Sequence, residues 1–323
     1  MHITTLKRAV KYQSKFWKNL KFGAKTALWT YLFDVQPTLN ISNKKIQALT
    51  DFAEKEFKQV IEKYKADQDK IKLQDYSGKI PVWIFWFQGK ESRPELVKIC
   101  NDSVEKFLPN DIAEIHYLSE ENYLDYVDIP EYIIEKHKKG KMCTAHFSDV
   151  IRVSLLAKYG GMWLDSTILV TEVITNKILS SDLYTLRIFD ENLYPKEPSR
   201  AIWNAFLWVS KPNNIFFCFL RDCLLSYWAK HNQMVDYILL DYIILIALKH
   251  FSYVKELMDK IEPNIKDMNL TYSSLNLEFT KEKWQEIIDN ASFHKLTYKY
   301  PLVDFTDDNK LTIYGYIKSI FNT

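Results

Sequence analysis

The sequence contains few glycines, seven in 323 residues, and no apolar run that could span a membrane. A membrane-spanning helix needs about 20 consecutive apolar residues. The best candidate, the segment from Tyr237 to Leu248, is too short and includes Asp241. The N-terminus also lacks the uninterrupted apolar segment and small-residue cleavage site of a signal peptide. We therefore expect neither a membrane span nor a signal peptide.

Cysteine motifs and a strong net charge are absent as well. The net charge is only +2, which gives no basic field around the whole molecule and argues against nucleic acid as a partner. The four cysteines form neither a CxxC pair nor a zinc-like cluster. We expect all of them to be reduced thiols in the core of a cytoplasmic protein: Cys100, Cys143, Cys218 and Cys223.

Acidic residues are missing from the first 33 residues. Before Asp34 there are seven lysines and arginines and no aspartate or glutamate. Val10, Phe16 and Trp17 lie between these basic residues at helical spacing. Such a segment can lie on an anionic membrane surface, or it can be a solvated helix packed on its own domain. The sequence supports both interpretations equally.

The residues that are present indicate an α/β protein. Residues 1–78 are predicted to be helical, and the break at Ser77-Gly78 separates them from a domain over residues 79–323. The apolar and aromatic segment 82–87 is typical of a buried strand in a mostly parallel sheet. Further elements are predicted along the chain: strands at 114–119, 162–166, 182–189 and 204–210, and helices at 94–108, from Ser119, and at 131–140, 144–159, 213–230, 236–251 and 280–289. Such alternation predicts ligand binding at the carboxyl ends of the strands.

The segment AKYGGMWLDSTILV, residues 157–170, contains two of the seven glycines side by side. Glycine lets a chain leave a helix through a left-handed turn or approach another group closely. Asp165 follows on a short apolar strand, where an aspartate is often placed for ligand or metal binding. In the preceding helix, Asp149 and Arg152 share one face. They form either a simple ion pair or, because that helix is otherwise apolar, a pair that faces a cleft.

The segment 148–167 resembles the donor-site signature of GT-A glycosyltransferases, Asp-x-x-Arg followed by Gly-Gly-x-aromatic-x-Asp. It is most similar to the capsular polysaccharide synthesis family, which is related to yeast-type mannosyltransferases and to glucosylating toxins with a DxD motif. Four more segments resemble that family in the same order: 80–89, 206–214, 236–242 and 293–299. The resemblance covers roughly residues 80–300. It implies a Rossmann-like GT-A fold with an N-terminal helical extension and a helical C-terminal part.

The resemblance also implies roles for individual residues. Asp149 and Arg152 would hold hydroxyls of the donor sugar, and Gly160 and Gly161 would let the chain pass close to the nucleotide. Asp165, the first acid of the DxD motif, would bind ribose and a divalent metal beside the diphosphate. Further residues would surround the base, the sugar and the phosphates: Trp86, Gln88, Gly89, Asn204, Lys295 and Lys299.

The expected metal site departs from the family motif, because Thr167 stands where the second acid is expected. Mn²⁺ or Mg²⁺ prefers carboxylate oxygens, so a hydroxyl weakens the site or passes the role to water and His294. The expected ligands are therefore Asp165, Thr167 and His294. Trp163 is expected in the core, and five histidines without metal-like spacing are expected to be structural: His116, His137, His146, His231 and His250.

Sugar transfer builds negative charge on the leaving diphosphate, which a metal or cationic side chains can stabilise. An inverting enzyme also needs a carboxylate to deprotonate the acceptor hydroxyl. Asp236 and Asp241 are the candidates, and the alternative is a helix cap and a buried polar pair. A retaining enzyme can work without that base, and the related families favour retention.

These observations predict a hexose-transferring glycosyltransferase of capsular or other surface polysaccharide synthesis. Its donor is expected to be a nucleotide sugar, UDP-linked, and its acceptor lipid-linked or an oligosaccharide. The basic N-terminus would hold it at the inner face of the plasma membrane. Two alternatives stay open: a catalytically degenerate nucleotide-sugar binder, suggested by Thr167, and a membrane-surface scaffold with a purely structural Asp149–Arg152 pair.

Overall fold

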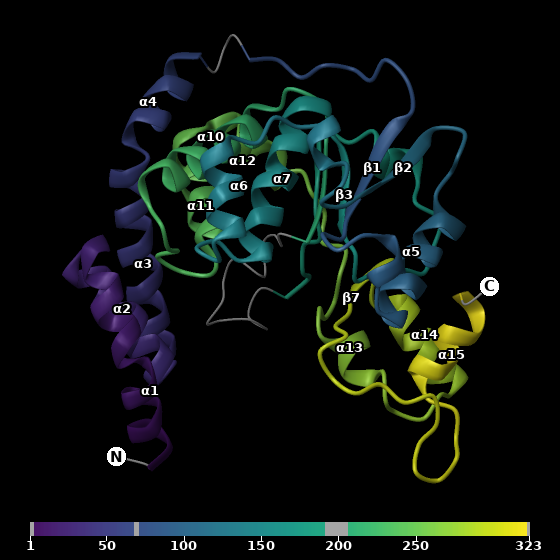
Figure 1. Cartoon of the computed structure of the whole chain (residues 1–323). Helices are drawn as coiled ribbons and strands as arrows, with labels where there is room; N and C mark the ends of the chain where they lie inside the picture. The colour runs from purple at the N-terminus through teal and green to yellow at the C-terminus, as the bar shows by residue number, and fades with distance from the viewer. Residues whose placement is uncertain (1–2, 68–70, 191–205, 322–323) are drawn as a thin grey trace.

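The computed structural model describes residues 3–67, 71–190 and 206–321 (Figure 1). Within this part of the chain the centre is a five-stranded sheet of order β2-β1-β3-β6-β5. Its strands are β1 (Ile80–Phe85), β2 (Ala113–Leu118), β3 (Gly161–Asp165), β5 (Leu183–Tyr184) and β6 (Leu207–Ser210). β1 is parallel to β2 and β3, whereas β6 is antiparallel to β3 and β5. Four of the five described strands thus share one direction, and the expected mostly parallel sheet of an α/β fold is confirmed.

The two faces of the sheet carry separate hydrophobic cores, because alternate residues of a strand point to opposite sides. Trp83, Trp163 and Trp208 lie in register across β1, β3 and β6. All three are buried in one core. Their neighbours Val82 and Met162 are buried in the other. The expectation that Trp163 is a core residue is therefore confirmed.

Helices cover both faces of the sheet. The core that contains the tryptophans is shared with α6 (Glu131–Lys138), α7 (Thr144–Tyr159), α10 (Ile215–Lys230), α11 (Leu239–His250) and α12 (Ser252–Asp259). The opposite core takes side chains from α5 (Glu95–Phe107) and α8 (Asn176–Leu179). α10 begins at the N-cap Asn214, whose side chain accepts a hydrogen bond from the backbone N–H of Phe216.

A second, antiparallel pair of strands lies next to the carboxyl end of β3. β4 (Ile168–Val170) pairs with β7 (Phe293–Lys295), with Ile168 opposite Lys295. The helices α13 (Leu270–Ser274), α14 (Lys281–Asn290) and α15 (Ile313–Phe321) belong to this C-terminal part. The β4–β7 pairing brings Lys295 close to the end of β3, although the two are far apart in sequence.

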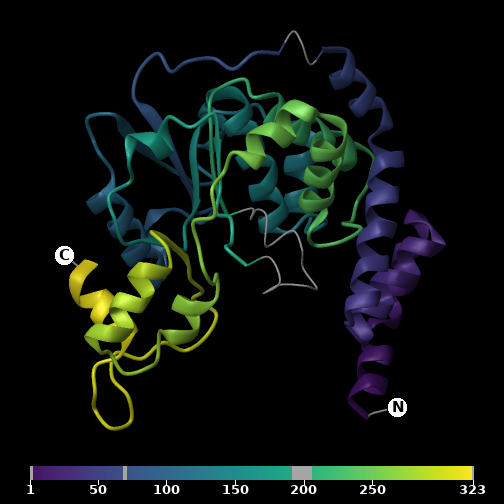
Figure 2. The ribbon, with the colours of Figure 1, turned by 180° about the vertical axis from the view of Figure 1, so that it is seen from behind.

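The N-terminal helices are α1 (Ile3–Asn19), α2 (Ala24–Val35), α3 (Leu39–Glu56) and α4 (Lys58–Asp67). Figures 1 and 2 show them at the opposite end of the molecule from α13–α15. Leu49, Phe57 and Ile61 are buried in the same core as α10 and α11. The helical prediction for residues 1–78 is correct for most of residues 3–67 and wrong for 71–78, which form no helix, and a domain boundary after Gly78 stays a prediction. Across the described ranges, no helix combines the length and the apolar character needed to cross a bilayer.

Several local predictions differ from the structure. The helix expected from Ser119 is only a 3-10 turn, η3 (Tyr123–Asp125), because the Asn122 side chain accepts from the Ser119 N–H and donates to the Tyr117 carbonyl. Those backbone groups are then satisfied without a helix. Two further 3-10 turns are η1 (Leu20–Phe22) and η2 (Lys90–Ser92). Among the cysteines, Cys143 is exposed and the prediction of a core thiol is wrong there, whereas Cys100, Cys218 and Cys223 are buried.

Candidate donor-binding site

A cavity of about 910 Å³ lies at the carboxyl ends of β1 and β3. This volume is in the range of ligand-binding cavities. Its walls come from the segment after β1, the first half of α7, the end of β3, the start of α11 and the segment after β7. A second hollow, of about 840 Å³ along α14, is lined mainly by charged side chains and contains no aromatic ring. The first cavity therefore has the better composition for a nucleotide ligand.

The double glycine shapes the backbone beneath this cavity. Gly160 ends α7 with φ +62° and Gly161 begins β3 with φ +88°. A Cβ on Gly160 would lie 2.5 Å from the Ser210 carbonyl oxygen, and one on Gly161 would lie 2.1 Å from the Pro81 carbonyl oxygen. Both glycines thus allow close contact between β3 and its neighbours. Neither lines the cavity, so the structure does not bring them to a bound nucleotide as the resemblance implied.

The close turn from α7 into β3 brings three predicted residues together. Arg152 is almost completely buried, and its Nη1 donates to Asp149 Oδ1 over 2.8 Å. Its Nη2 donates to Asp165 Oδ1 over 3.0 Å. Trp163 Nε1 donates to the same Asp165 oxygen over 3.0 Å, and Lys295 Nζ donates to Asp165 Oδ2 over 2.7 Å. The Asp149–Arg152 pair therefore faces the cavity, as one of the two sequence interpretations had it.

The two carboxylates differ in acidity. Burial would raise the pKa of Asp165, but the charges of Lys295 and Arg152 hold this pKa below its usual value. For Asp149 the effect of burial dominates and raises its pKa, despite the attraction of Arg152. Asp165 is thus the permanent anion of the site and Asp149 the weaker acid.

An aromatic rim borders the cavity on the side of β1 and β7. The rings of Trp86 and Tyr298 meet edge to face with centroids 5.6 Å apart, and Trp86 Nε1 donates to Ser92 Oγ. Gln88 and Lys299 also line the cavity, so these predicted residues are brought together. Gly89 lies outside the lining; its φ of +86° forms the turn into η2.

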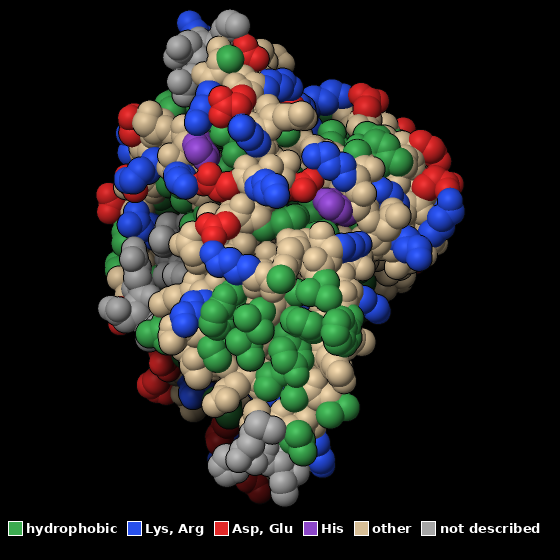
Figure 3. All heavy atoms as spheres, turned by 90° about the vertical axis from the view of Figure 1, so that its left-hand side faces the viewer, with side chains coloured by type: hydrophobic (Ala, Val, Ile, Leu, Met, Phe, Trp, Pro, Cys, Tyr) green, Lys and Arg blue, Asp and Glu red, His purple; other side chains and the backbone are tan. Residues whose placement is uncertain are grey.

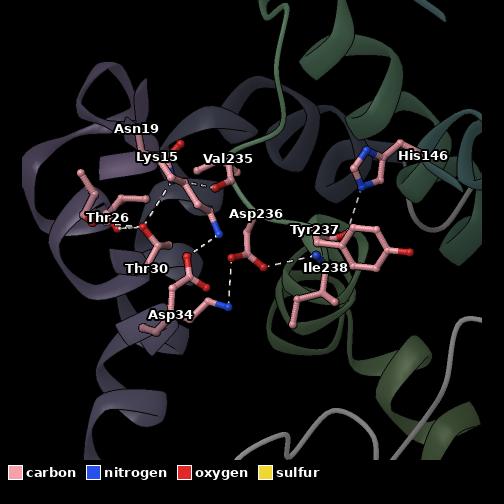
Figure 4. A network of polar contacts seen from close by, with 12 residues as sticks. Lys15, Asn19, Thr26, Thr30, Asp34, His146, Val235, Asp236, Tyr237 and Ile238 are labelled. Carbon is pink, nitrogen blue, oxygen red and sulfur yellow. Dashed lines mark hydrogen bonds and ion pairs between the residues drawn. The ribbon is translucent and has the colours of Figure 1, made fainter. Parts of the chain in front are cut away.

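Asp236 and Asp241 have different surroundings. Asp236 forms a buried ion pair with Lys45 of α3 over 3.0 Å and accepts a hydrogen bond from the backbone N–H of Ile238 (Figure 4). It does not line the cavity, whereas Asp241 does. The structure thus brings only Asp241 to the candidate site, and it supports the cap and buried-pair interpretation for Asp236.

His294 lies away from the cavity. Its Nδ1 is 2.8 Å from Thr271 Oγ1 and its Nε2 is 3.1 Å from Thr171 Oγ1. Burial lowers the pKa of His294 to about 4, so the ring is neutral at physiological pH. The structure therefore does not bring His294 to Asp165 and Thr167, which both line the cavity. Asn204 lies outside the described residues.

His146 was expected to be structural, but it lines the cavity. Its Nδ1 is 3.3 Å from Cys143 Sγ and its Nε2 is 3.2 Å from the Tyr237 carbonyl oxygen. Although burial lowers it, the pKa of His146 is raised overall by contact with Cys143. Tyr237 also lines the cavity. The signal in the sequence was the spacing of His146 from Asp149, three residues along one helix face.

The donor atoms near Asp165 do not fit an ordinary divalent metal site. Both Asp165 oxygens already accept hydrogen bonds from charged groups, Arg152 and Lys295. Thr167 supplies no carboxylate. Among the residues that the structure describes, no cluster of three or more His, Cys, Asp or Glu side chains could hold a metal ion. Hard cations bind to several oxygen ligands, most of them carboxylates or carbonyls, and this site offers few.

A family model described as "Capsular polysaccharide synthesis protein" matches residues 30–317. The chain belongs to the capsular polysaccharide synthesis protein family. The match to this family begins within α2, so α3 and α4, which share a core with α10 and α11, lie inside the family region. Membership in the family supports a glycosyltransferase role for the chain.

The other comparisons add less. No curated protein matches the sequence. One similar solved structure is "PaToxG Glycosyltransferase", with 14% identity, coverage of 66% of this chain and 83% of that chain, and a TM-score of 0.41. A likeness of this size is too weak to carry an argument about the fold or the site.

Proposed function

We propose that this member of the capsular polysaccharide synthesis family is a hexosyltransferase that uses a UDP-linked sugar. The observation that carries the proposal is the convergence of Asp149, Arg152 and Asp165 in one cavity beside the aromatic ring of Trp86. Carboxylates and a guanidinium can hold sugar hydroxyls, and an aromatic ring can stack on a base. The proposed acceptor is a lipid-linked or oligosaccharide precursor of a surface polysaccharide.

The proposed transfer retains the anomeric configuration. The bond between the anomeric carbon and the diphosphate oxygen breaks, and its electron pair stays on the diphosphate. The acceptor oxygen bonds to the anomeric carbon on the same face, and its proton passes to the departing diphosphate. Arg152 and Lys295 supply fixed positive charge near Asp165 while this negative charge develops. This route requires no carboxylate base, in keeping with the burial of Asp236.

The first test measures the melting temperature with UDP-, GDP- and CDP-sugars, with and without Mn²⁺. Ligands that bind only the folded state raise this temperature by mass action. We expect a shift with UDP-sugars that Asp165→Asn removes. The matched control is Asp222→Asn, because Asp222 also accepts from two cationic side chains, Lys63 and Arg221, but lies outside the cavity.

Two results would contradict the proposed activity. A chain that gives no shift with any nucleotide sugar would favour the scaffold alternative. A chain that binds UDP-sugars but releases no sugar from them, with or without a glycan acceptor, would favour the degenerate binder.

We further propose that α1 holds the protein against the inner, cytoplasmic face of the plasma membrane. Leu6, Val10 and Trp17 are four and seven residues apart, so they share one helix face. Their exposed fractions are 54%, 69% and 61%. Lys7 and Lys11 lie on the adjacent face and are also exposed. Figure 3 views the molecule from the side of the N-terminal helices and shows a patch of hydrophobic side chains on its lower half.

An anionic lipid surface suits this combination of features. Apolar side chains enter the interface between headgroups and acyl chains, and the neighbouring lysines attract anionic lipid. The region before Asp34 contains no acidic residue that would repel such a surface. A membrane location would also bring the cavity close to a lipid-linked acceptor.

Co-sedimentation with vesicles tests this membrane proposal. We expect the native chain to bind vesicles of phosphatidylglycerol and phosphatidylcholine, and to bind pure phosphatidylcholine much more weakly. Leu6→Asp should abolish binding. The control Leu277→Asp, which changes a similarly exposed leucine in the C-terminal part, should leave it intact. Equal binding of the two variants would contradict the assignment to α1.

A further inference from the structure

The donor cavity contains positive side chains where the family motif predicts a metal. Lys295 comes from β7, and the pairing of β7 with β4 brings it beside the end of β3. Its Nζ lies 2.7 Å from Asp165 Oδ2 and 5.3 Å from the centroid of the Phe206 ring. A carboxylate and an aromatic face therefore fix the ammonium group at the cavity wall.

The ammonium group of Lys295 has N–H donors that the contact with Asp165 does not use. A lysine has three N–H donors, and the contact with Asp165 uses one of them. Lys299 also lines the cavity, and within the described ranges its ammonium group forms no ion pair. The cavity therefore offers two lysines to an anionic ligand, and Lys295 lies where Asp165 would hold a metal.

A divalent ion at Asp165 would have to replace these contacts. It would compete with Arg152 for one carboxylate oxygen and with Lys295 for the other. The position of the second acid is Thr167, and His294 is engaged with Thr171 and Thr271 in the core. An ion at Asp165 would therefore cost the site two charge-assisted hydrogen bonds.

We infer that Lys295 takes the place of a divalent ion at the donor diphosphate, so that the chain binds and uses its donor without metal. The inference rests on the proposed glycosyltransferase function. As the bond from the anomeric carbon to the diphosphate breaks, the electron pair stays on the diphosphate oxygen. An N–H of Lys295 donates to the diphosphate and the lysine stays protonated. The acceptor oxygen forms a bond to the anomeric carbon, and the proton of the acceptor hydroxyl passes to the diphosphate.

The test compares binding of UDP and of uridine by calorimetry, in EDTA and in Mn²⁺. We expect UDP to bind with the same affinity in both, and more tightly than uridine. This comparison uses the native chain and needs no variant. Binding of UDP that appears only with Mn²⁺ would overturn the inference and leave the proposed function standing. Absence of binding by UDP, GDP and CDP under both conditions would overturn the proposed function and the inference with it.

Variants then assign the effect to Lys295. Lys295→Met keeps the apolar stem and removes the charge, and we expect it to weaken UDP binding about tenfold or more, as befits a lost charge-assisted bond. Uridine binding should stay unchanged, and Lys295→Arg should retain most of the UDP affinity. The control is Lys211→Met, since Lys211 is also held by carboxylates, those of Asp75 and Asp182, but lies outside the cavity. Unchanged UDP affinity in a folded Lys295→Met chain would overturn the role of Lys295.

Discussion

At Gly161 the backbone of β3 passes so close to β1 that no side chain fits between them. A Cβ would lie 2.1 Å from the Pro81 carbonyl oxygen, and φ is +88°. We expect Gly161→Ala to lower the free energy of unfolding by about 3 kcal/mol, from steric overlap and backbone strain together. Gly140→Ala is the matched control, because Gly140 has φ +66° and open space around it. Gly140→Ala should lower the free energy of unfolding by only about 1 kcal/mol. Chemical denaturation measures both, and equal losses would show that the close contact contributes nothing.

His294 makes stability depend on pH. Its pKa is about 4 in the folded chain and near 6.5 when exposed, so between these values the unfolded chain binds more protons. Stability is therefore lost as the pH falls through this window. Between pH 7 and pH 5 the loss from this group should be about 2 kcal/mol. Urea unfolding of the native chain and of His294→Gln at both pH values measures it. The pH dependence should be smaller in the variant, and an unchanged dependence would contradict a buried neutral ring.

At the scale of single elements, the ion pair between Lys45 and Asp236 connects α3 to the segment before α11. Both side chains are at least 90% buried. Breaking a buried pair by removing one partner costs about 3–5 kcal/mol. We expect Lys45→Met and Asp236→Asn each to destabilise the fold, and the double variant to lose less than the sum. The rate of sugar transfer per folded molecule should stay the same in Asp236→Asn. A fall of about 100-fold or more would instead make Asp236 the catalytic base.

Several elements could be predicted from the sequence because their local signals agree with their packing. The apolar segment that became β1 and the helix that became α7 are buried as expected. The strand predicted at 182–189 is reduced to Leu183–Tyr184. β4 was not predicted, since a run of three residues has no recognisable period. Its partner β7 was recognised only as part of the family segment 293–299. The sequence of neither segment alone predicts that the two pair.

At the scale of the site, the sequence predicted the residues that stand out by their charge in an otherwise apolar segment. Asp149, Arg152 and Asp165 meet as expected. The positions of His146 and His294 relative to the cavity were not predicted from the sequence, because they depend on which way each side chain points after the chain has folded. His146 lines the cavity, whereas His294 is in the core.

For the whole molecule, the N-terminal helices share one hydrophobic core with the sheet domain. Leu49, Phe57, Ile61 and Tyr64 are all buried in it. We expect a chain that begins at Lys79 not to fold, because the loss of these contacts exposes the apolar faces of α10 and α11. A chain that begins at Asn19 should fold, because Asn19 keeps its bond to the Val235 carbonyl, and it should lose vesicle binding (Figure 4). Circular dichroism and thermal unfolding measure both. Cooperative unfolding of the chain from Lys79 would make residues 1–78 an independent extension.

The shared core cannot form until late in synthesis. The helices α3 and α4 leave the ribosome early, but their buried face packs against α10 and α11, which are made much later. At about 5–20 residues per second, the wait from residue 57 to residue 243 is roughly 10–40 s. During that interval the faces of α3 and α4 that pack on α10 and α11 lack those partners, although α3 can already pack on α2. The basic, aromatic α1 precedes these helices in the chain, so a membrane or a chaperone can meet it before the donor cavity exists.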